Sequence, residues 1–314
     1  MNLADTRGTA KVLLLTLISW VWPIDRLLLI AQMLGKLSGR KDPIRSAAPD
    51  RVPPRQFSEQ HFARSDRLLE ARMQILGLLR PGRQWRPKIK WHGLEHVQAA
   101  LCQNTGAILW DGLFVYRQLI TGMAFHEAGF RLVNLSRPGH GFSGIGGLSS
   151  PFADQYINVH CRSVEEKFAD RLWVGENTLG DMRHLLAANR IIKILVWDRG
   201  QKTVEVPFFA TGKIVIATGP VHLSHVSGAP LVPVFTLQAE DGAYEVNVGP
   251  PLQVPRASAG SKVDYAAIIR SYVELLEPYV QRQPDQWVGW DTVRWSTVRS
   301  VTSGGEGFCS AGGP

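Results

Sequence analysis

The chain has 314 residues, of which 45% are hydrophobic and 20% are charged, a composition that excludes a largely disordered protein and allows one large or two smaller domains. Its formal net charge of +8 favours anionic partners such as phospholipid headgroups or an acidic carrier protein. Some stretches of the chain are locally basic, but they carry no zinc-finger or RNA-binding signature, so we expect no nucleic-acid partner. Cys102, Cys161 and Cys309 lie far apart and favour plain thiols in a reducing compartment.

The first 40 residues hold the most hydrophobic stretch of the chain. The apolar run at 12–22 is shorter than the roughly 20 residues that a membrane-spanning helix needs. Pro23 interrupts the pattern, and a longer span would place Asp25 and Arg26 near its centre at about 3 kcal/mol each. Residues 1–40 therefore favour two short amphipathic helices that dock on a membrane surface. A cleaved secretory signal and a buried helical pair of a soluble core are the alternatives.

The rest of the chain divides into a linker, one domain and a tail. Residues 41–57 are rich in proline, arginine and aspartate and are typical of a linker, whereas the low-complexity tail at 300–314 indicates disorder. Residues 58–299 alternate between strand and helix patterns, which predicts an α/β domain with a mixed central sheet flanked by helices. The expected strands are at 88–91, 106–110, 130–135, 190–197, 230–238 and 244–249. The expected helices are at 58–79, 94–104, 113–128, 177–189, 218–228 and 264–282.

The motifs that most often bind cofactors or metals are absent from the sequence. The glycine-rich stretch PGHGFSGIGG lacks the lysine of a phosphate-binding loop, the dinucleotide fingerprint and the spacing of a nucleophile elbow. It favours a loop over a cleft. The pairs His92/His96 and His222/His225 have no partner ligands at metal spacing. We therefore expect no metal site and no cofactor.

Seven stretches follow one another in an order that carries a family resemblance. They read WHGLEHVQAAL, GAILW, FRLVNLSRP, RIIKILVWDRG, VEVPFFATGKIVIATGP, SGAPLVPVFTLQ and YVELLEPYVQRQPDQWVGW. From about residue 86 to 295 the chain resembles the bacterial lipid A biosynthesis acyltransferase family, within the lysophospholipid acyltransferase-like superfamily. The amphipathic amino terminus is also similar to the membrane-docking start of that family. The resemblance implies an acyltransferase-like α/β fold.

The same resemblance implies acyl transfer. Family members move a fatty acyl group, usually from acyl carrier protein, to a hydroxyl of a lipid or sugar acceptor at the cytoplasmic face of the inner membrane. Their base is the histidine of an H-x-x-x-x-[DE] motif just after the first buried core strand. An alcohol is a weak nucleophile near neutral pH, so the imidazole must take its proton as attack begins, and the carboxylate orients the ring.

The two catalytic positions of that motif are occupied here by Leu113 and Gln118. Leucine has no proton acceptor and glutamine has no charge, so the family's histidine–carboxylate mechanism cannot operate. General-base assistance is typically worth ~10²–10⁴ in rate. The candidates for a replacement base are Asp111, on the same strand-to-helix turn, and His140 in the glycine-rich loop. The alternative for Asp111 is an N-cap of the following helix.

Three further residues match positions of the family. Arg137 matches an arginine on the acceptor or phosphate side, where a guanidinium suits anionic oxygens. Asp198 and Arg199 match an Asp-Gln pair after a central strand. The resemblance therefore implies that Arg137, Asp198 and Arg199 bind substrate.

Together these features lead us to expect an enzyme. It would transfer a fatty acyl group from an acyl carrier protein or CoA thioester to a hydroxyl or amine of a lipid-like acceptor, and an amine would need less help from a base. It would dock on phospholipid at the cytoplasmic face of the bacterial inner membrane, peripherally or with shallow insertion. The alternative is a catalytically inactive protein that binds lipid or acyl carrier.

Overall fold

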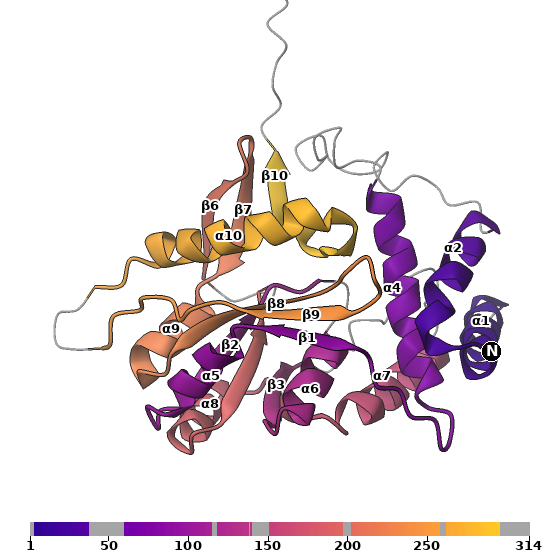
Figure 1. The fold of residues 1–314 in the computed structure, drawn as a ribbon, viewed down its shortest axis with the longest axis horizontal. Helices are drawn as coiled ribbons and strands as arrows, with labels where there is room; N and C mark the ends of the chain where they lie inside the picture. Colours follow the sequence, from indigo (N-terminus) through magenta and orange to yellow (C-terminus); the bar gives the residue numbers. More distant parts are fainter. Residues whose placement is uncertain are drawn as a thin grey trace, which may run out of the picture.

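A seven-stranded sheet forms the centre of the molecule (Figure 1). The computed structural model describes residues 3–37, 60–114, 118–137, 139, 151–196, 202–257 and 262–295. The strands of this sheet are β1 (Ile89–His92), β2 (Ala107–Asp111), β3 (Leu132–Ser136), β4 (Ala169–Trp173), β5 (Ile191–Leu195), β8 (Leu231–Gln238) and β9 (Tyr244–Val248). They lie in the order β1-β9-β8-β2-β5-β3-β4, and all neighbours are parallel except β8 and β9. The predicted mixed α/β sheet is confirmed.

Helices cover both faces of the sheet because successive residues of a strand point to opposite sides. Ala107 and Leu109 pack against α5 (Leu94–Leu101) and α6 (Gln118–Glu127). Ile108 and Trp110 face α8 (Thr178–Ala187), α9 (Gly219–Ser227) and α10 (Tyr265–Arg282). Figure 1 shows α10 on one side of the sheet together with a small antiparallel sheet. The strands of the small sheet are β6 (Thr203–Phe208), β7 (Gly212–Ala217) and β10 (Val293–Trp295).

The amino-terminal helices share a second core with the domain. This group comprises α1 (Leu3–Val21), the 3₁₀ turn η1 (Ile24–Arg26), α2 (Leu27–Leu37), α4 (Gln60–Gly77) and α7 (Pro151–Glu165). Val12 and Leu27 are fully buried in a cluster that also contains residues of α4, α6 and α7. The predicted amino-terminal helical pair is therefore confirmed, and its inner side packs on the domain.

The outer side of the same pair is apolar and exposed. The exposed residues recur at helical spacing and form what we call the apolar stripes: Leu13, Leu14, Leu17, Val21 and Trp22 along α1, and Leu29, Met33 and Leu37 along α2. In the described ranges, no single helix is long and apolar enough to cross a membrane. Segments 6–21 and 24–37 meet that test only together, and they bend by 118° at the break between them.

The sequence patterns missed several elements and misplaced one boundary. They did not predict α7, β4, the β6–β7 hairpin or β10. Of the helix expected at 113–128, the structure describes Gln118–Glu127, and Leu113 and Phe114 form a turn and a β-bridge instead of helix. The linker predicted at 41–57 and the tail at 300–314 lie outside the described residues.

Candidate active site at the carboxyl ends of the central strands

The turn after β2 is held in one strained shape at the carboxyl end of the central strand. Leu113 has a φ of 45°, a left-handed conformation that costs about 1–3 kcal/mol for a residue other than glycine. The Asp111 carboxylate accepts a hydrogen bond from the Leu113 N–H at 2.9 Å, and the Leu113 carbonyl accepts one from the Val288 N–H at 3.3 Å. A Cβ at Gly112 would lie 2.6 Å from the Phe235 ring, so glycine is required there.

Aromatic side chains pack around this turn. Phe114 and Trp287 are fully buried and face each other in an antiparallel bridge. The ring of Phe208 has its centroid 5.1 Å from that of Trp287. Leu113 itself is only 8% exposed. The position at which the family carries its histidine therefore holds an apolar side chain in apolar surroundings.

Asp111 lies beside a buried lysine. The Lys193 Nζ on β5 is 3.8 Å from Asp111 Oδ2, and both side chains are almost completely buried. Burial raises the pKa of the Asp111 carboxyl group, and the Lys193 cation opposes that rise. Burial lowers the pKa of Lys193, which the Asp111 carboxylate opposes. The distance is that of an ion pair rather than a direct hydrogen bond, so Asp111 is a charge-compensated interior carboxylate.

A row of polar side chains continues from this pair across the sheet. Asn134 on β3 is the register partner of both Lys193 on β5 and Arg171 on β4. Register partners in a parallel sheet point to the same face. Arg171 pairs with Glu165 of α7 at 3.1 Å and donates to Ser136 Oγ at 2.8 Å. The charged interior therefore extends from β2 to β4, and Glu165 at the end of α7 contacts it.

Cationic and aromatic groups gather where β3 and β4 end. Arg137 is exposed just after β3, and its carbonyl accepts a hydrogen bond from Arg162 Nη2 at 3.3 Å. The Arg162 guanidinium lies 4.9 Å from the ring centroid of Trp173, and that of Arg171 lies 5.4 Å from it. Trp173 is 47% exposed. Such guanidinium–aromatic groups suit anionic oxygens at a surface.

The structure places only part of the predicted site. Asp111 and Arg137 both lie at the carboxyl edge of the sheet, on strands β2 and β3 that β5 separates. The N-cap alternative for Asp111 is wrong for α6, because that helix begins at Gln118 and Asp111 caps the Leu113 N–H instead. His140, Asp198 and Arg199 lie outside the described residues, so their roles stay predictions.

Sequence reasoning missed Lys193, Arg162 and Trp173. A lysine inside the otherwise apolar stretch RIIKILVW was the available signal for Lys193, because a charge in a buried strand needs a partner. Arg162 and Trp173 lie on α7 and near the end of β4. The apolar spacing of Ala153, Ile157, Cys161 and Val164 could have revealed α7.

The two histidine pairs singled out in the sequence are not arranged as metal ligands. His222 Nδ1 lies 3.2 Å from the Tyr265 hydroxyl, and His225 Nδ1 lies 2.6 Å from the Pro255 carbonyl. Gly93, with a φ of 77°, separates His92 from the helix that carries His96. In the described part of the chain, no three histidine, cysteine or acidic side chains come together as metal ligands.

Comparison with known protein families gives one match. Residues 69–297 match the family described as bacterial lipid A biosynthesis acyltransferase, and a search of curated proteins gave no match. The matched stretch begins in α4, contains both sheets and extends past β10. It supports acyl transfer as the general function. Because the match covers most of the chain and agrees with the seven stretches in their order, the chain belongs to the bacterial lipid A biosynthesis acyltransferase family.

Proposed function

We propose that the protein transfers a fatty acyl group from an acyl carrier protein or CoA thioester to a lipid-like acceptor at a membrane surface. The observation that carries this proposal is the turn after β2. In an acyltransferase-family chain, the strained backbone of Leu113 and the neighbouring Asp111 keep the frame of the catalytic motif although its histidine is replaced. Strain of this kind persists where the surrounding structure over-determines it, and functional sites are where it gathers.

The chemistry of this turn favours an amine acceptor over a hydroxyl. A neutral amine attacks the thioester carbonyl directly, the carbon–sulfur bond breaks, and the departing thiolate takes the proton that the nitrogen loses. A hydroxyl needs a base from the outset. Asp111 could be that base only if it leaves its contacts, because it is 2% exposed and holds the Leu113 N–H. His140 is the other proposed base.

The acceptor that we propose carries negative charge. Arg137 and Arg162 stand at the carboxyl ends of β3 and β4, where they would face an acceptor approaching the edge of the sheet. Guanidinium groups bind phosphate and carboxylate oxygens through paired hydrogen bonds. Asp198 and Arg199 belong to the same proposed substrate site.

The apolar stripes support docking on phospholipid. They place large apolar side chains of α1 and α2 in solvent while the opposite sides of these helices pack on the domain. An amphipathic helix gains most from such a stripe when the stripe enters the interface of a bilayer. We propose the cytoplasmic face of the bacterial inner membrane as the location, with shallow insertion of α1 and α2.

A second candidate function is binding without catalysis. The burial of Leu113 and the ion pair between Asp111 and Lys193 favour it, because neither side chain presents a reactive atom to a substrate. In this role the protein would bind lipid or acyl carrier, with the frame of the site retained for binding.

One assay separates the two functions. The purified chain is mixed with acyl carrier protein and CoA thioesters and with hydroxyl- and amine-bearing lipid acceptors, and product is followed by mass spectrometry. Turnover that falls at least about tenfold in Asp111→Asn or His140→Ala supports the rewired enzyme. Asp241→Asn, an exposed carboxylate on the β8–β9 turn, is the matched control. If no pair of substrates gives product and the protein nevertheless binds the thioester, its function is binding without catalysis.

A further inference from the structure

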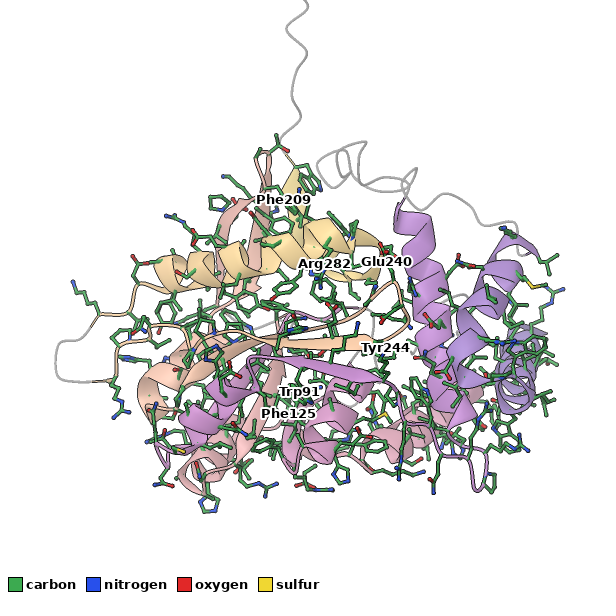
Figure 2. The ribbon with its side chains drawn as sticks, in the orientation of Figure 1. Trp91, Phe125, Phe209, Glu240, Tyr244 and Arg282 are labelled. Carbon is green, nitrogen blue, oxygen red and sulfur yellow. The ribbon has the colours of Figure 1, made fainter. Side chains whose placement is uncertain are left out.

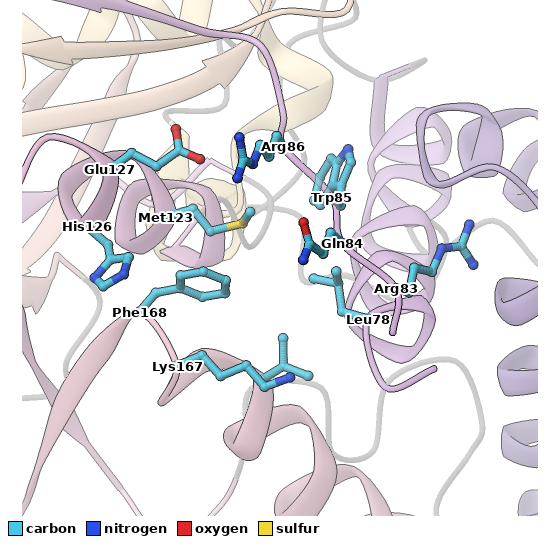
Figure 3. A pocket seen from close by; sticks show the side chains of 11 residues that line it. Leu78, Arg83, Gln84, Trp85, Arg86, Met123, His126, Glu127, Lys167 and Phe168 are labelled. Carbon is cyan, nitrogen blue, oxygen red and sulfur yellow. The ribbon is translucent and has the colours of Figure 1, made fainter. Parts of the chain in front are cut away.

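A cavity of about 700 Å³ opens between the segment that follows α4 and the ends of two helices of the domain (Figure 3). Its walls come from residues 78–86, from the last turn of α6 and from the end of α7. Cavities of roughly 300–1,000 Å³ are the size at which proteins bind small molecules. The chemistry of the walls decides which class of molecule fits.

The cavity lies at the opposite end of the sheet from the candidate active site. His126 and Phe168 line it, and they precede β3 and β4 in the chain. Arg137 and Trp173 lie at the other ends of the same strands. A strand of five residues spans about 16 Å. The cavity is therefore a different site from the turn after β2.

Apolar side chains line much of the cavity: Leu78, Trp85, Met123, Val164 and Phe168. The indole of Trp85 is fixed in place because its Nε1–H donates to the Asp25 carboxylate at 2.9 Å. Figure 3 shows Phe168 and Met123 across the cavity from Leu78 and Trp85. An alkyl chain would find apolar contacts on both sides.

Positive charge surrounds this apolar lining. Arg83, Arg86 and Lys167 line the cavity, and Glu127 is the carboxylate that lines it with them. Figure 3 places Arg86 and Glu127 near one end and Lys167 at the other. Among the described residues, no salt bridge joins Arg86 or Lys167 to a carboxylate. Charge complementarity therefore selects an anion.

The two helix ends at the cavity do not cancel that charge. The carboxyl end of a helix is electronegative because its last carbonyls lack partners within the helix. Here the carbonyls of Phe125 and His126 accept from the N–H groups of Phe130 and Gly129, and that of Glu165 accepts from Phe168. Capping of this kind satisfies the terminal carbonyls, so the side-chain cations dominate the rim.

The cavity shares a wall with the end of α1. Arg83 donates to the carbonyls of Ser19, Trp20 and Trp22, which are the last acceptors of that helix. Val21, beside them, is 80% exposed and belongs to the apolar stripes. The cavity therefore adjoins an exposed apolar surface from which an alkyl chain could enter.

We infer that this cavity binds an anionic amphiphile with a single alkyl chain. Its carboxylate or phosphate contacts Lys167, at the end of the cavity away from the Glu127 carboxylate, and its chain lies between Phe168 and Trp85. A fatty carboxylate and a phosphate-headed lysolipid share this chemistry. The site is separate from acyl transfer, so its occupancy does not depend on whether the turn after β2 is active.

Calorimetric titration of the full chain tests the inference with three probes below their critical micelle concentrations: dodecanoate, lauroyl lysophosphatidic acid and uncharged dodecyl maltoside. We expect the anionic probes to bind at least about tenfold more tightly than the maltoside. The variant Arg86→Gln with Lys167→Gln should weaken anion binding by at least about tenfold. Gln84→Trp, an exposed lining position, should fill the cavity and block both anions. A preference between dodecanoate and the lysolipid identifies the headgroup.

The matched control is Lys262→Gln with Arg270→Gln, which removes the same charge from exposed positions before and on α10. It should leave all three affinities unchanged. Equal binding of the maltoside, unaltered anion binding by Gln84→Trp, or no binding of either anion by the unsubstituted chain at millimolar concentration would overturn the inference. These outcomes say nothing about acyl transfer, so the proposal for the active site stands or falls separately.

Discussion

Leu113 holds a backbone conformation that histidine and asparagine adopt more readily than leucine does. Histidine at this position would therefore gain a proton acceptor and lose strain at the same time. The hydrogen bonds of the turn use the backbone of Leu113 and not its side chain, and the surrounding aromatic side chains belong to other residues, so the substitution leaves the frame in place.

Restoring the motif should consequently create or raise activity toward hydroxyl acceptors. Leu113→His combined with Gln118→Glu is expected to increase turnover by ~10²–10⁴, the usual contribution of a general base. Mass-spectrometric detection of the acylated acceptor measures it. Leu113→Asn combined with Gln118→Glu is the matched control, since asparagine accepts the same φ but cannot take a proton. A gain in the asparagine variant as large as in the histidine variant would contradict the base mechanism.

The buried pair of Asp111 and Lys193 makes a second prediction at this scale. Lys193→Met leaves a carboxylate buried without its counter-charge, so we expect a loss of about 3–5 kcal/mol in the free energy of unfolding. The double variant Asp111→Asn with Lys193→Met should lose less free energy of unfolding than Lys193→Met alone, because it leaves no buried charge without a partner. Urea unfolding of the single and double variants measures the coupling, and strict additivity would contradict it.

The same pair predicts a pH dependence with a definite sign. Burial raises the pKa of Asp111, and Lys193 limits that rise. In Lys193→Met the folded-state pKa of Asp111 therefore lies further above its unfolded value. The folded state then binds more protons than the unfolded state, so stability should fall as pH rises above the ordinary pKa of an aspartate carboxyl group. The double variant Asp111→Asn with Lys193→Met should lack this additional dependence of stability on pH. Urea unfolding midpoints of both variants, measured at several pH values, test the difference.

At the scale of elements, the outer sides of α1 and α2 carry the membrane proposal. Deleting both helices would remove Val12 and Leu27 from the second core and uncover the rest of it, so substitution on the exposed side is the cleaner experiment. Leu17→Glu with Met33→Glu places two charges in the apolar stripes without touching that core.

These two charges should reduce binding to vesicles of phosphatidylethanolamine and phosphatidylglycerol by at least about tenfold, because each removes an apolar contact worth about 1.5–3 kcal/mol. Cosedimentation measures the bound fraction. Leu179→Glu, at an exposed leucine on α8 outside the apolar stripes, is the control and should have no effect. Unchanged sedimentation of the double variant would refute docking through α1 and α2.

The elements that sequence patterns predicted are those with strong apolar runs. GAILW, RIIKILVW and PLVPVFTLQ form β2, β5 and β8, whose side chains are buried on both faces of the sheet. The pattern fails for β4, an edge strand in which Asp170 and Arg171 take part in ion pairs. It also fails for the β6–β7 hairpin, whose turn has Phe209 at a φ of 49° instead of a glycine or asparagine signal.

The parts of the candidate site that the sequence predicts are those whose position depends only on neighbouring residues of the chain. The place of Leu113 follows from its distance to a strand that any α/β fold must bury. The pairing of Asp111 with Lys193 was not predictable, because it depends on β5 entering the sheet next to β2, and strand order is a property of the whole fold. The ion pair of Arg171 with Glu165 likewise requires the end of α7 to lie beside β4.

For the whole molecule, α6 joins the two cores. Leu119, Ile120 and Met123 pack among the amino-terminal helices, whereas Ala124 and Phe125 pack under the sheet. One helix thus contributes to both cores, and we expect the described domain and its amino-terminal helices to unfold together.

Cys161 reports on that cooperativity. It is fully buried in the second core, and burial raises the pKa of its thiol well above the usual range. In a Cys309→Ser background, Cys102 should react with a disulfide reagent at pH 8 within seconds, since it is exposed, while Cys161 should react only as fast as the chain unfolds. Thiol release followed by absorbance gives both rates. Rapid reaction of Cys161 without loss of the sheet's circular dichroism would show that the amino-terminal helices open independently.

The two arginines that hold the end of α1 also make a mechanical connection. Arg80 and Arg83 bind carbonyls of Trp20 and its neighbours, and the segment that carries them leads directly into β1. Through these two guanidinium groups, a displacement of α1 would pull on the segment that leads into β1, an edge strand of the central sheet.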